Sequence, residues 1–220
     1  MRVIKAYTEI LNKNEIKGID VLKKIEIVGR TCYKSENLIS EESSLGFVER
    51  IINRGHEAMI EHYSISVRFI CDRGVSHELV RHRIASFAQE STRYCNYSKD
   101  KFGNELTFIK PCFLDENSEK YNEWKTTMEF IEKKYFKMLE LGLTPQEARS
   151  VLPNSLKTEI VMTANIREWR SFFKLRVDKA AHPQMRELTI PLLKEMKETI
   201  PVVFDDIYDK LQNEGVYNEW

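Results

Sequence analysis

The segment over residues 81–94 carries the densest set of side chains that could do chemistry. It reads Arg81-His82-Arg83, then seven residues, then Ser91-Thr92-Arg93. Arginine offers a planar fork of donors, so this segment would suit a phosphate-bearing ligand with a flat ring. An isolated Arg-His-Arg is also explained by a solvated basic helix end that meets the negative end of the helix dipole. The hydroxyls and the arginine that follow favour the ligand-binding interpretation.

The same spacing, Arg-His-Arg followed after seven residues by Ser-x-Arg, resembles the signature of the flavin-dependent thymidylate synthases. The resemblance extends over most of the chain. It implies synthesis of dTMP from dUMP without a covalent protein nucleophile, with methylenetetrahydrofolate as one-carbon donor and FAD reduced by NAD(P)H. It also implies an α/β (α+β) fold with a mixed sheet flanked by helices, and a homotetramer with active sites shared between chains.

The resemblance implies flavin contacts in several segments. Arg81-His82-Arg83 matches positions that hold the flavin, and residues 55–62 resemble an upstream segment in which His-x-x-x-x-Glu-His is typical. Asn165-Ile166-Arg167 matches a second flavin segment, and Ser171 aligns with a polar contact. His182 is assigned as a flavin neighbour, although His182-Pro183 could simply open a helix. The expected flavin set is His56, Ala58, Arg81, His82, Arg83, Gln89, Asn165, Ile166, Arg167, Ser171 and His182.

The dUMP contacts follow from the resemblance in the same way. Residues 78–81 and 89–93 match its dUMP segments, and Ala-Arg-x-x-Leu-Pro at residues 148–153 brings in Arg149. Ser91 could be a nucleophile, but no histidine is fixed beside it by the sequence, so we interpret it as a dUMP ligand. The expected substrate set is Glu78, Leu79, Val80, Arg81, Gln89, Glu90, Ser91, Thr92, Arg93, Arg149 and Arg176.

Arg176 is the expected catalytic residue. Leu175-Arg176 matches the Leu-Arg whose arginine is thought to favour the N3-ionised pyrimidine. Hydride attack at C6 of dUMP builds negative charge over O4, N3 and O2, which a positioned arginine would stabilise. A flavin would supply the redox chemistry, while the protein supplies placement and electrostatics.

Composition narrows the class of protein. The 220 residues suit one compact domain over residues 1–220, and 34 acidic side chains balance 34 basic ones, which argues against general nucleic-acid binding. No stretch approaches the roughly 20 apolar residues of a membrane helix.

The cysteines give no sign of a metal or disulfide site. Four scattered cysteines without a Cys-x-x-Cys pair predict reduced thiols in a cytoplasm and no metal site. Pro111-Cys112-Phe113 lacks the histidine that follows the cysteine in the unrelated class of thymidylate synthase.

Periodicity and capping signals predict alternating strands and helices. Strands are expected over residues 1–8, 64–71, 106–110 and 157–163, where apolar residues alternate or cluster. Helices are expected over residues 20–34, from a cap at Ser40 to about residue 55, and over 74–83, 119–141 and 183–199. Asn165-Ile166-Arg167-Glu168 is expected to cap a further helix that runs to about residue 177. Thr144-Pro145-Gln146-Glu147 predicts a helix start, and Pro201 is expected to begin the last helix.

Two other functions remain open at this point. A nucleic-acid-binding module could use residues 81–93 as a phosphate patch, and it would be colourless and salt-sensitive. A flavin enzyme of the same fold could methylate or reduce a different pyrimidine. A visible flavin spectrum that responds to dUMP would separate these alternatives.

Overall fold

The computed structural model describes residues 1–99 and 103–215, and the chain forms two compact units. The first unit comprises Met1–Tyr7, Phe69–Arg81 and Phe87–Val161. The second comprises Thr8–Arg68, His82–Ser86 and the chain from Met162 onward. Strands and helices are mixed along the chain, which confirms the α/β class predicted from the sequence.

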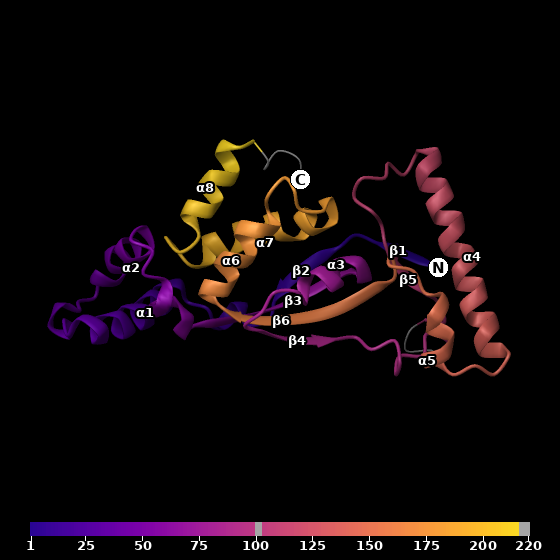
Figure 1. Ribbon diagram of the computed structural model, residues 1–220, viewed down its shortest axis with the longest axis horizontal. Coiled ribbons are helices and arrows are strands. Elements are labelled where there is room, and N and C mark those ends of the chain that lie inside the picture. Colours follow the sequence, from indigo (N-terminus) through magenta and orange to yellow (C-terminus); the bar gives the residue numbers. More distant parts are fainter. Residues whose placement is uncertain (100–102, 216–220) are drawn as a thin grey trace. The chain divides into compact units, whose positions relative to one another are not determined.

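A four-stranded sheet has the order β2, β3, β6, β4 (Figure 1). The long strands β3 and β6 contribute residues to both units. Along β6 every second side chain is buried, as expected for a strand with one covered face. The bounds are β2 Tyr7–Ile10, β3 Ser64–Asp72, β4 Ala85–Gln89 and β6 Lys157–Asn165.

The single strand predicted over residues 1–8 is instead two strands. β1 (Arg2–Ile4) pairs in parallel with β5 (Thr107–Ile109), with Val3 opposite Phe108. β2 pairs with β3, and just beyond its end the Leu11 amide donates to the Ser66 carbonyl at 2.9 Å. The prediction was wrong because the two halves satisfy their backbone hydrogen bonds with different, distant partners.

In the first unit, helices pack around a core that includes Phe108, Met128 and Tyr135. The longest helix starts at the Ser118 cap, whose Oγ accepts from the Tyr121 amide at 3.1 Å. The start predicted at Thr144 is confirmed, with a complete capping box to Glu147. The helices are α3 Arg73–Leu79, α4 Glu119–Glu140, α5 Pro145–Ala148 and the 3₁₀ helix η5 Arg149–Val151.

In the second unit, helix α6 is anchored by aromatic packing. Trp169, Phe172 and Phe173 are fully buried, and the Trp169 indole donates to the Ile65 carbonyl of β3 at 3.1 Å. Helices α1 and α2 pack on each other (Figure 1). The helices are α1 Gly18–Tyr33, α2 Ser43–Asn53, α6 Ile166–Arg176, α7 Pro183–Thr199, α8 Asp205–Asn213, and the 3₁₀ helices η1 Lys13–Glu15, η2 Glu36–Leu38 and η3 Glu57–His62.

Two predicted helix starts were wrong for identifiable reasons. Ser40 does not cap α2; the Ser40 amide instead donates to Ser43 Oγ at 2.8 Å, and that hydroxyl donates to Glu26 at 2.8 Å. The last helix begins at Asp205 rather than Pro201. The Val203 carbonyl, which a helix from Pro201 would have used, accepts a hydrogen bond from Arg170 instead. Within the described ranges, no helix is both long and apolar enough to span a membrane.

Candidate functional site

The Arg81-His82-Arg83 tripeptide lies after helix α3 and not on it. The sequence predicted a helix through residue 83, but α3 ends at Leu79 and a tight turn follows, in which the Arg81 amide donates to the Glu78 carbonyl at 3.2 Å. The turn lets His82 enter the interior while Arg81 and Arg83 stay exposed. The helix cannot continue into β4, which begins at Ala85, because Ile84 has a left-handed backbone with a φ of +65°.

In the second unit, His82 is buried among Arg176, Glu168 and Phe172 of helix α6. Its side chain is enclosed, and its Nε2 accepts a hydrogen bond from Arg176 Nε at 2.9 Å. Its Nδ1 lies 3.5 Å from Glu168 Oε1, and the ring meets Phe172 edge to face at 4.9 Å. Because Nε2 accepts, the neutral ring carries its proton on Nδ1, facing Glu168. His82 therefore holds Arg176 from one side and Glu168 from the other.

Burial and charge keep this histidine neutral. Burial lowers the pKa of His82 to about 4, and the positive charge of Arg176 contributes to the shift. Burial also raises the pKa of the Glu168 carboxyl above its usual range. The Thr189 hydroxyl donates to the Arg176 carbonyl at 2.9 Å, which fixes the last turn of α6. Two hydrogen bonds therefore position Arg176, one at its backbone carbonyl and one at its Nε.

Helix α6 and its cap carry four of the predicted flavin residues, and three of them line one pocket. Asn165 caps the helix, as predicted, with its Oδ1 accepting from the Glu168 amide at 2.9 Å. Asn165, Arg167 and Ser171 line one pocket of about 350 Å³. The pocket is completed by Glu61, Glu168 and the exposed Ile84. Ile166 between them is fully buried, so only its backbone could meet a ligand.

Ile84 is a pocket residue that the sequence did not reveal. It follows Arg83, has a φ of +65°, and its side chain is 81% exposed. A β-branched residue in the left-handed region is strained, and such strain gathers at functional sites. The pocket therefore combines an exposed apolar side chain with amide, hydroxyl and guanidinium donors and two carboxylates.

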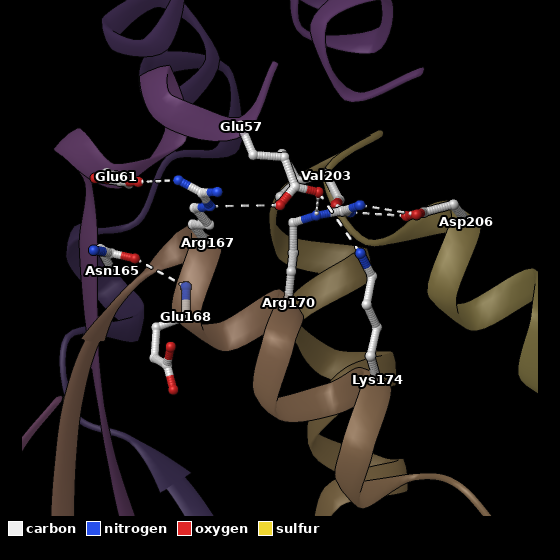
Figure 2. Close-up of polar contacts among 9 residues, drawn as sticks. All are labelled: Glu57, Glu61, Asn165, Arg167, Glu168, Arg170, Lys174, Val203 and Asp206. Carbon is white, nitrogen blue, oxygen red and sulfur yellow. Dashed lines mark hydrogen bonds and ion pairs between the residues drawn. The ribbon is translucent and has the colours of Figure 1, made fainter. Parts of the chain in front are cut away.

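A second face of α6 carries three cations that meet carboxylates (Figure 2). Arg170 is buried, and its guanidinium binds both oxygens of Asp206, at 2.7 and 2.8 Å. Its Nε donates to Glu57 at 3.1 Å. Lys174 lies 3.7 Å from the same carboxylate. The network ties η3 and α8 to α6, and it thereby positions the segment that begins at His56.

Arg167 belongs to the same network. Its Nη1 contacts Glu61 at 2.5 Å and its Nε lies 3.9 Å from Glu57 (Figure 2). Any ligand at Arg167 would share the guanidinium with Glu61. The sequence analysis named neither Arg170 nor Asp206 as important. The one local signal was the spacing of Arg167, Arg170 and Lys174, which places three cations on one side of a helix.

In the first unit, the carboxamide of Gln89, the last residue of β4, and the carboxylate of Glu90, which follows it, bind other side chains of the protein. Gln89 Nε2 donates to Ser76 Oγ at 2.9 Å and to Thr158 Oγ1 at 3.2 Å. Glu90 accepts from the Tyr97 hydroxyl at 2.9 Å and pairs with Lys157 at 3.2 Å. These contacts hold the strand end from which the Ser-Thr-Arg turn continues.

The Ser-Thr-Arg turn meets Arg149. Arg149 Nη1 lies 3.4 Å from the Thr92 hydroxyl, so two segments 57 residues apart come together. Arg93 is exposed and follows directly in the same turn. Ser91 Oγ accepts from the Arg93 amide at 3.3 Å. No histidine in the described part of the chain hydrogen bonds to Ser91, which favours a binding role over a nucleophilic one.

The remaining predicted residues have separate environments. His56 is exposed and its Nδ1 lies 2.8 Å from the Tyr33 hydroxyl, while Ala58 is exposed in η3. His182 caps α7, with Nδ1 accepting from the Gln184 amide at 3.3 Å.

The three predicted substrate residues before Arg81 differ in exposure. Leu79 is fully buried, whereas Val80 is exposed and Glu78 is half-buried. Thus Leu79 could offer a ligand only its backbone.

The predicted substrate and flavin residues divide between the two units. The first unit holds all the predicted substrate residues except Arg176. The second holds the predicted flavin residues except Arg81 and Gln89. Across the described residues there is no group of histidine, cysteine, aspartate and glutamate side chains that could bind a metal ion.

Comparisons with known proteins show which family the chain resembles. The family described as "Thymidylate synthase complementing protein" matches residues 17–202. A flavin-dependent thymidylate synthase of Pyrococcus furiosus is 34% identical over 186 residues, which cover 84% of this chain and 75% of that protein. One from Geobacter sulfurreducens is 30% identical over 189 residues, covering 83% and 80%.

A solved structure shares the fold. The UMP/dUMP methylase PolB from Streptomyces cacaoi, bound with 5-Br UMP, superposes with a TM-score of 0.73 at 17% identity, covering 96% of this chain and 97% of that chain. The motif spacing, the pocket at the start of α6 and the matches over most of the chain lead to one assignment. The chain belongs to the family of flavin-dependent thymidylate synthases.

Proposed function

We propose that this protein converts dUMP to dTMP, with methylenetetrahydrofolate as the one-carbon donor and FAD reduced by NAD(P)H. The observation that carries the proposal is the arrangement along α6. Asn165, Arg167 and Ser171 line one pocket, and Arg176 ends the same helix against a neutral His82. A flavin and a charge-stabilising arginine would then be positioned by a single rigid element.

The residues of this chain would have distinct roles in that reaction. Asn165, Arg167 and Ser171 would hold a flavin, which would supply the hydride chemistry. Arg176 stabilises the negative charge that develops over O4, N3 and O2 of the uracil. Arg149 and the Ser91-Thr92-Arg93 turn bind the phosphate of dUMP through guanidinium and hydroxyl donors. His82 acts through Arg176 by accepting from its Nε.

Cysteine chemistry has no part in the proposed mechanism. Cys71 is fully buried, and burial raises the pKa of its thiol well above the ordinary value, so it is not a thiolate at neutral pH. Cys32, Cys95 and Cys112 are in no disulfide bond among the described residues, and none of them lines the pocket at the start of α6. A cytoplasmic location and the absence of nucleic-acid and membrane partners stay predictions from the sequence.

The first test is the visible spectrum of the purified protein after incubation with FAD and desalting. We expect a stoichiometric flavin spectrum that dUMP perturbs, and UMP serves as the competing pyrimidine. A featureless spectrum would exclude the proposal. A flavin spectrum that responds to UMP and not to dUMP would point to the other pyrimidine enzyme.

A matched pair at Asn165 separates flavin binding from folding. Aspartate keeps the capping oxygen but loses the amide donors, whereas alanine loses both. We expect Asn165→Asp to fold with normal stability and bind FAD weakly. Asn165→Ala should bind FAD weakly and also lose about 1 kcal/mol of unfolding free energy. Unchanged FAD affinity in both variants would remove Asn165 from the flavin site.

Arg176 is tested by single-turnover oxidation of reduced flavin in the presence of dUMP and methylenetetrahydrofolate. Arg176→Ala should retain FAD and lose roughly a hundredfold in rate. Arg176→Lys should recover only part of the rate, because a point charge lacks the planar fork. A near wild-type rate in Arg176→Ala would show that another group, with Arg149 the first to examine, stabilises the charge.

A further inference from the structure

A pocket separate from the one at the start of α6 lies in the second unit, beside helices α1 and α2. Its volume is about 230 Å³. Its rim carries Arg50, Arg54, Tyr33 and His56, and Phe47 and Ile51 form an apolar part of its lining. No acidic side chain lines it. It therefore offers a positively charged rim over an apolar floor.

Among the residues that the structure describes, the two rim arginines form no ion pair with a carboxylate. Arg50 lies in the last turn of α2, and Arg54, four residues on, is the residue that caps the end of this helix. Like charges at this spacing repel on a helix surface. The arrangement differs from that of α6, where each cation of the Glu57 network meets an acid. An anion bound between Arg50 and Arg54 would relieve the repulsion.

The third arginine of the pocket has a different role. Arg30 is buried, and its Nε and Nη2 donate to Glu26 at 3.1 and 2.9 Å. Its guanidinium also lies 4.7 Å from the centre of the Phe47 ring. Because Glu26 neutralises it, Arg30 supports the wall of the pocket and adds no net charge. The charge available to a ligand comes from Arg50 and Arg54.

The polar pair beside the arginines extends the donor set. The Tyr33 hydroxyl and His56 Nδ1 are 2.8 Å apart, so each orients the other. Gly46 leaves room for Arg50, since a Cβ at that position would lie 3.3 Å from its Nη1. Guanidinium pairs recognise phosphate and carboxylate groups through paired hydrogen bonds. The apolar floor suits the carbon part of a ligand that carries such a group.

We propose that this pocket binds the anionic end of a co-substrate, a phosphate or a carboxylate held by Arg50 and Arg54. The identification with a co-substrate rests on the proposed function, whereas the anion site itself rests on the pocket alone. Two sources share this chemistry: the 2′-phosphate of a nicotinamide dinucleotide phosphate and the glutamate carboxylates of a folate. His56, predicted to contact flavin, lies on the rim.

Direct binding tests the anion site without catalysis. The probe is inorganic pyrophosphate, titrated by calorimetry into the wild type and into Arg50→Gln/Arg54→Gln. The control Lys23→Gln removes an exposed charge from α1 outside the pocket. We expect the double variant to bind pyrophosphate at least roughly tenfold more weakly, and the control to bind normally. Equal affinity in all three proteins would overturn the anion site even if the enzyme makes dTMP.

Kinetics distinguish the two sources. If the 2′-phosphate binds here, the double variant should show a KM for NADPH roughly tenfold higher and an unchanged KM for NADH. If folate carboxylates bind here, the KM for polyglutamylated methylenetetrahydrofolate should rise far more than that for the monoglutamate. FAD content and kcat should stay close to wild type in the double variant. Arg50→Lys/Arg54→Lys, which keeps both charges, should retain much of the co-substrate affinity that the glutamine variant loses. Unchanged KM values for every co-substrate would overturn the assignment to a co-substrate.

Discussion

At the scale of single residues, His82 explains why a basic tripeptide can be more than a solvated helix end. Its two neighbours are exposed, but its own ring is buried between Arg176 and Glu168. A buried imidazole that accepts from a guanidinium must be neutral, and its lowered pKa agrees with that geometry. His82 is therefore a positioning residue for Arg176, in addition to its predicted contact with the flavin.

The first prediction concerns the coupling of His82 to Arg176. His82→Phe leaves the Arg176 Nε without its acceptor and should slow the single-turnover rate roughly tenfold or more. His82→Gln, which retains an acceptor, should lose much less. In an Arg176→Ala background, His82→Phe should have little further effect. The same loss in both backgrounds would show that His82 acts on the flavin independently of Arg176.

A second prediction is a pH dependence of stability that comes from His82. Its pKa is about 4 in the folded protein and about 6.5 when unfolded, so the unfolded state binds more protons between these values. Stability should fall as the pH drops through this window, by about 2 kcal/mol from pH 7 to pH 5. Urea unfolding at both pH values measures the loss in wild type and in His82→Gln.

The variant acts as the control for all other titrating groups, including Glu168, whose raised pKa opposes the trend. The loss of stability between pH 7 and pH 5 should be clearly smaller in His82→Gln. If wild type and variant lose the same free energy, His82 is not buried as a neutral group.

At the scale of elements, helix α6 organises the site with two different faces. Glu168, Phe172 and Arg176 recur every four residues and surround His82. Arg167, Arg170 and Lys174 form the other row and meet the carboxylate of Glu57. Eleven residues of one helix therefore hold the predicted catalytic arginine and also fix the loop that carries His56.

The third prediction concerns the contact between α1 and α2. A Cβ at Gly29 would lie 2.5 Å from the Phe47 ring, so Gly29→Ala should overpack the contact and cost about 1–3 kcal/mol of unfolding free energy. Gly46→Ala on α2 is the matched control. Its Cβ would meet only the flexible end of Arg50, so the gain in helix propensity should leave stability unchanged or raise it by up to about 1 kcal/mol.

Denaturant unfolding of both variants measures the difference. Because Phe47 also lies under Arg30 in the anion pocket, Gly29→Ala should weaken pyrophosphate binding as well. Equal stability of the two glycine variants would mean that the helices can separate at no cost at this point.

At the scale of the whole molecule, the division of predicted site residues between two units bears on assembly. The predicted substrate segments other than Arg176 lie in the first unit, and most predicted flavin residues lie in the second. The homotetramer with shared active sites remains a prediction from the family resemblance. In such a tetramer, the substrate segment of one chain and the flavin segment of a neighbouring chain could form one active site.

The fourth prediction tests that sharing. Arg81→Ala and Arg176→Ala should each lose most of the activity, and mixing the two variants under subunit exchange should restore part of it. The reason is that some mixed sites would receive an intact Arg81 from one chain and an intact Arg176 from another. Light scattering gives the oligomeric state in parallel. A fully active monomer, or no recovery despite proven exchange, would contradict shared sites.

The sequence alone was sufficient for the features that depend on neighbouring residues. The Asn165 cap, the capping box at Thr144 and the alternation along β6 each involve contacts or periodicity within a few residues, so local chemistry determines them. The family was equally accessible, because the spacing of the signature from Arg81 to Arg93 can be read without the fold.

Only the tertiary structure decided which of these side chains are buried, paired or exposed. The end of α3 at Leu79, the burial of His82 and its contact with Arg176, 94 residues away, have no local signal. The spacing of Arg170 with its neighbours indicates a row of cations, but it does not reveal their partners: Arg170 meets Glu57 and Asp206, which are 113 and 36 residues distant. Burial and long-range charge pairing depend on the packing of whole elements, which no spacing along the chain encodes by itself.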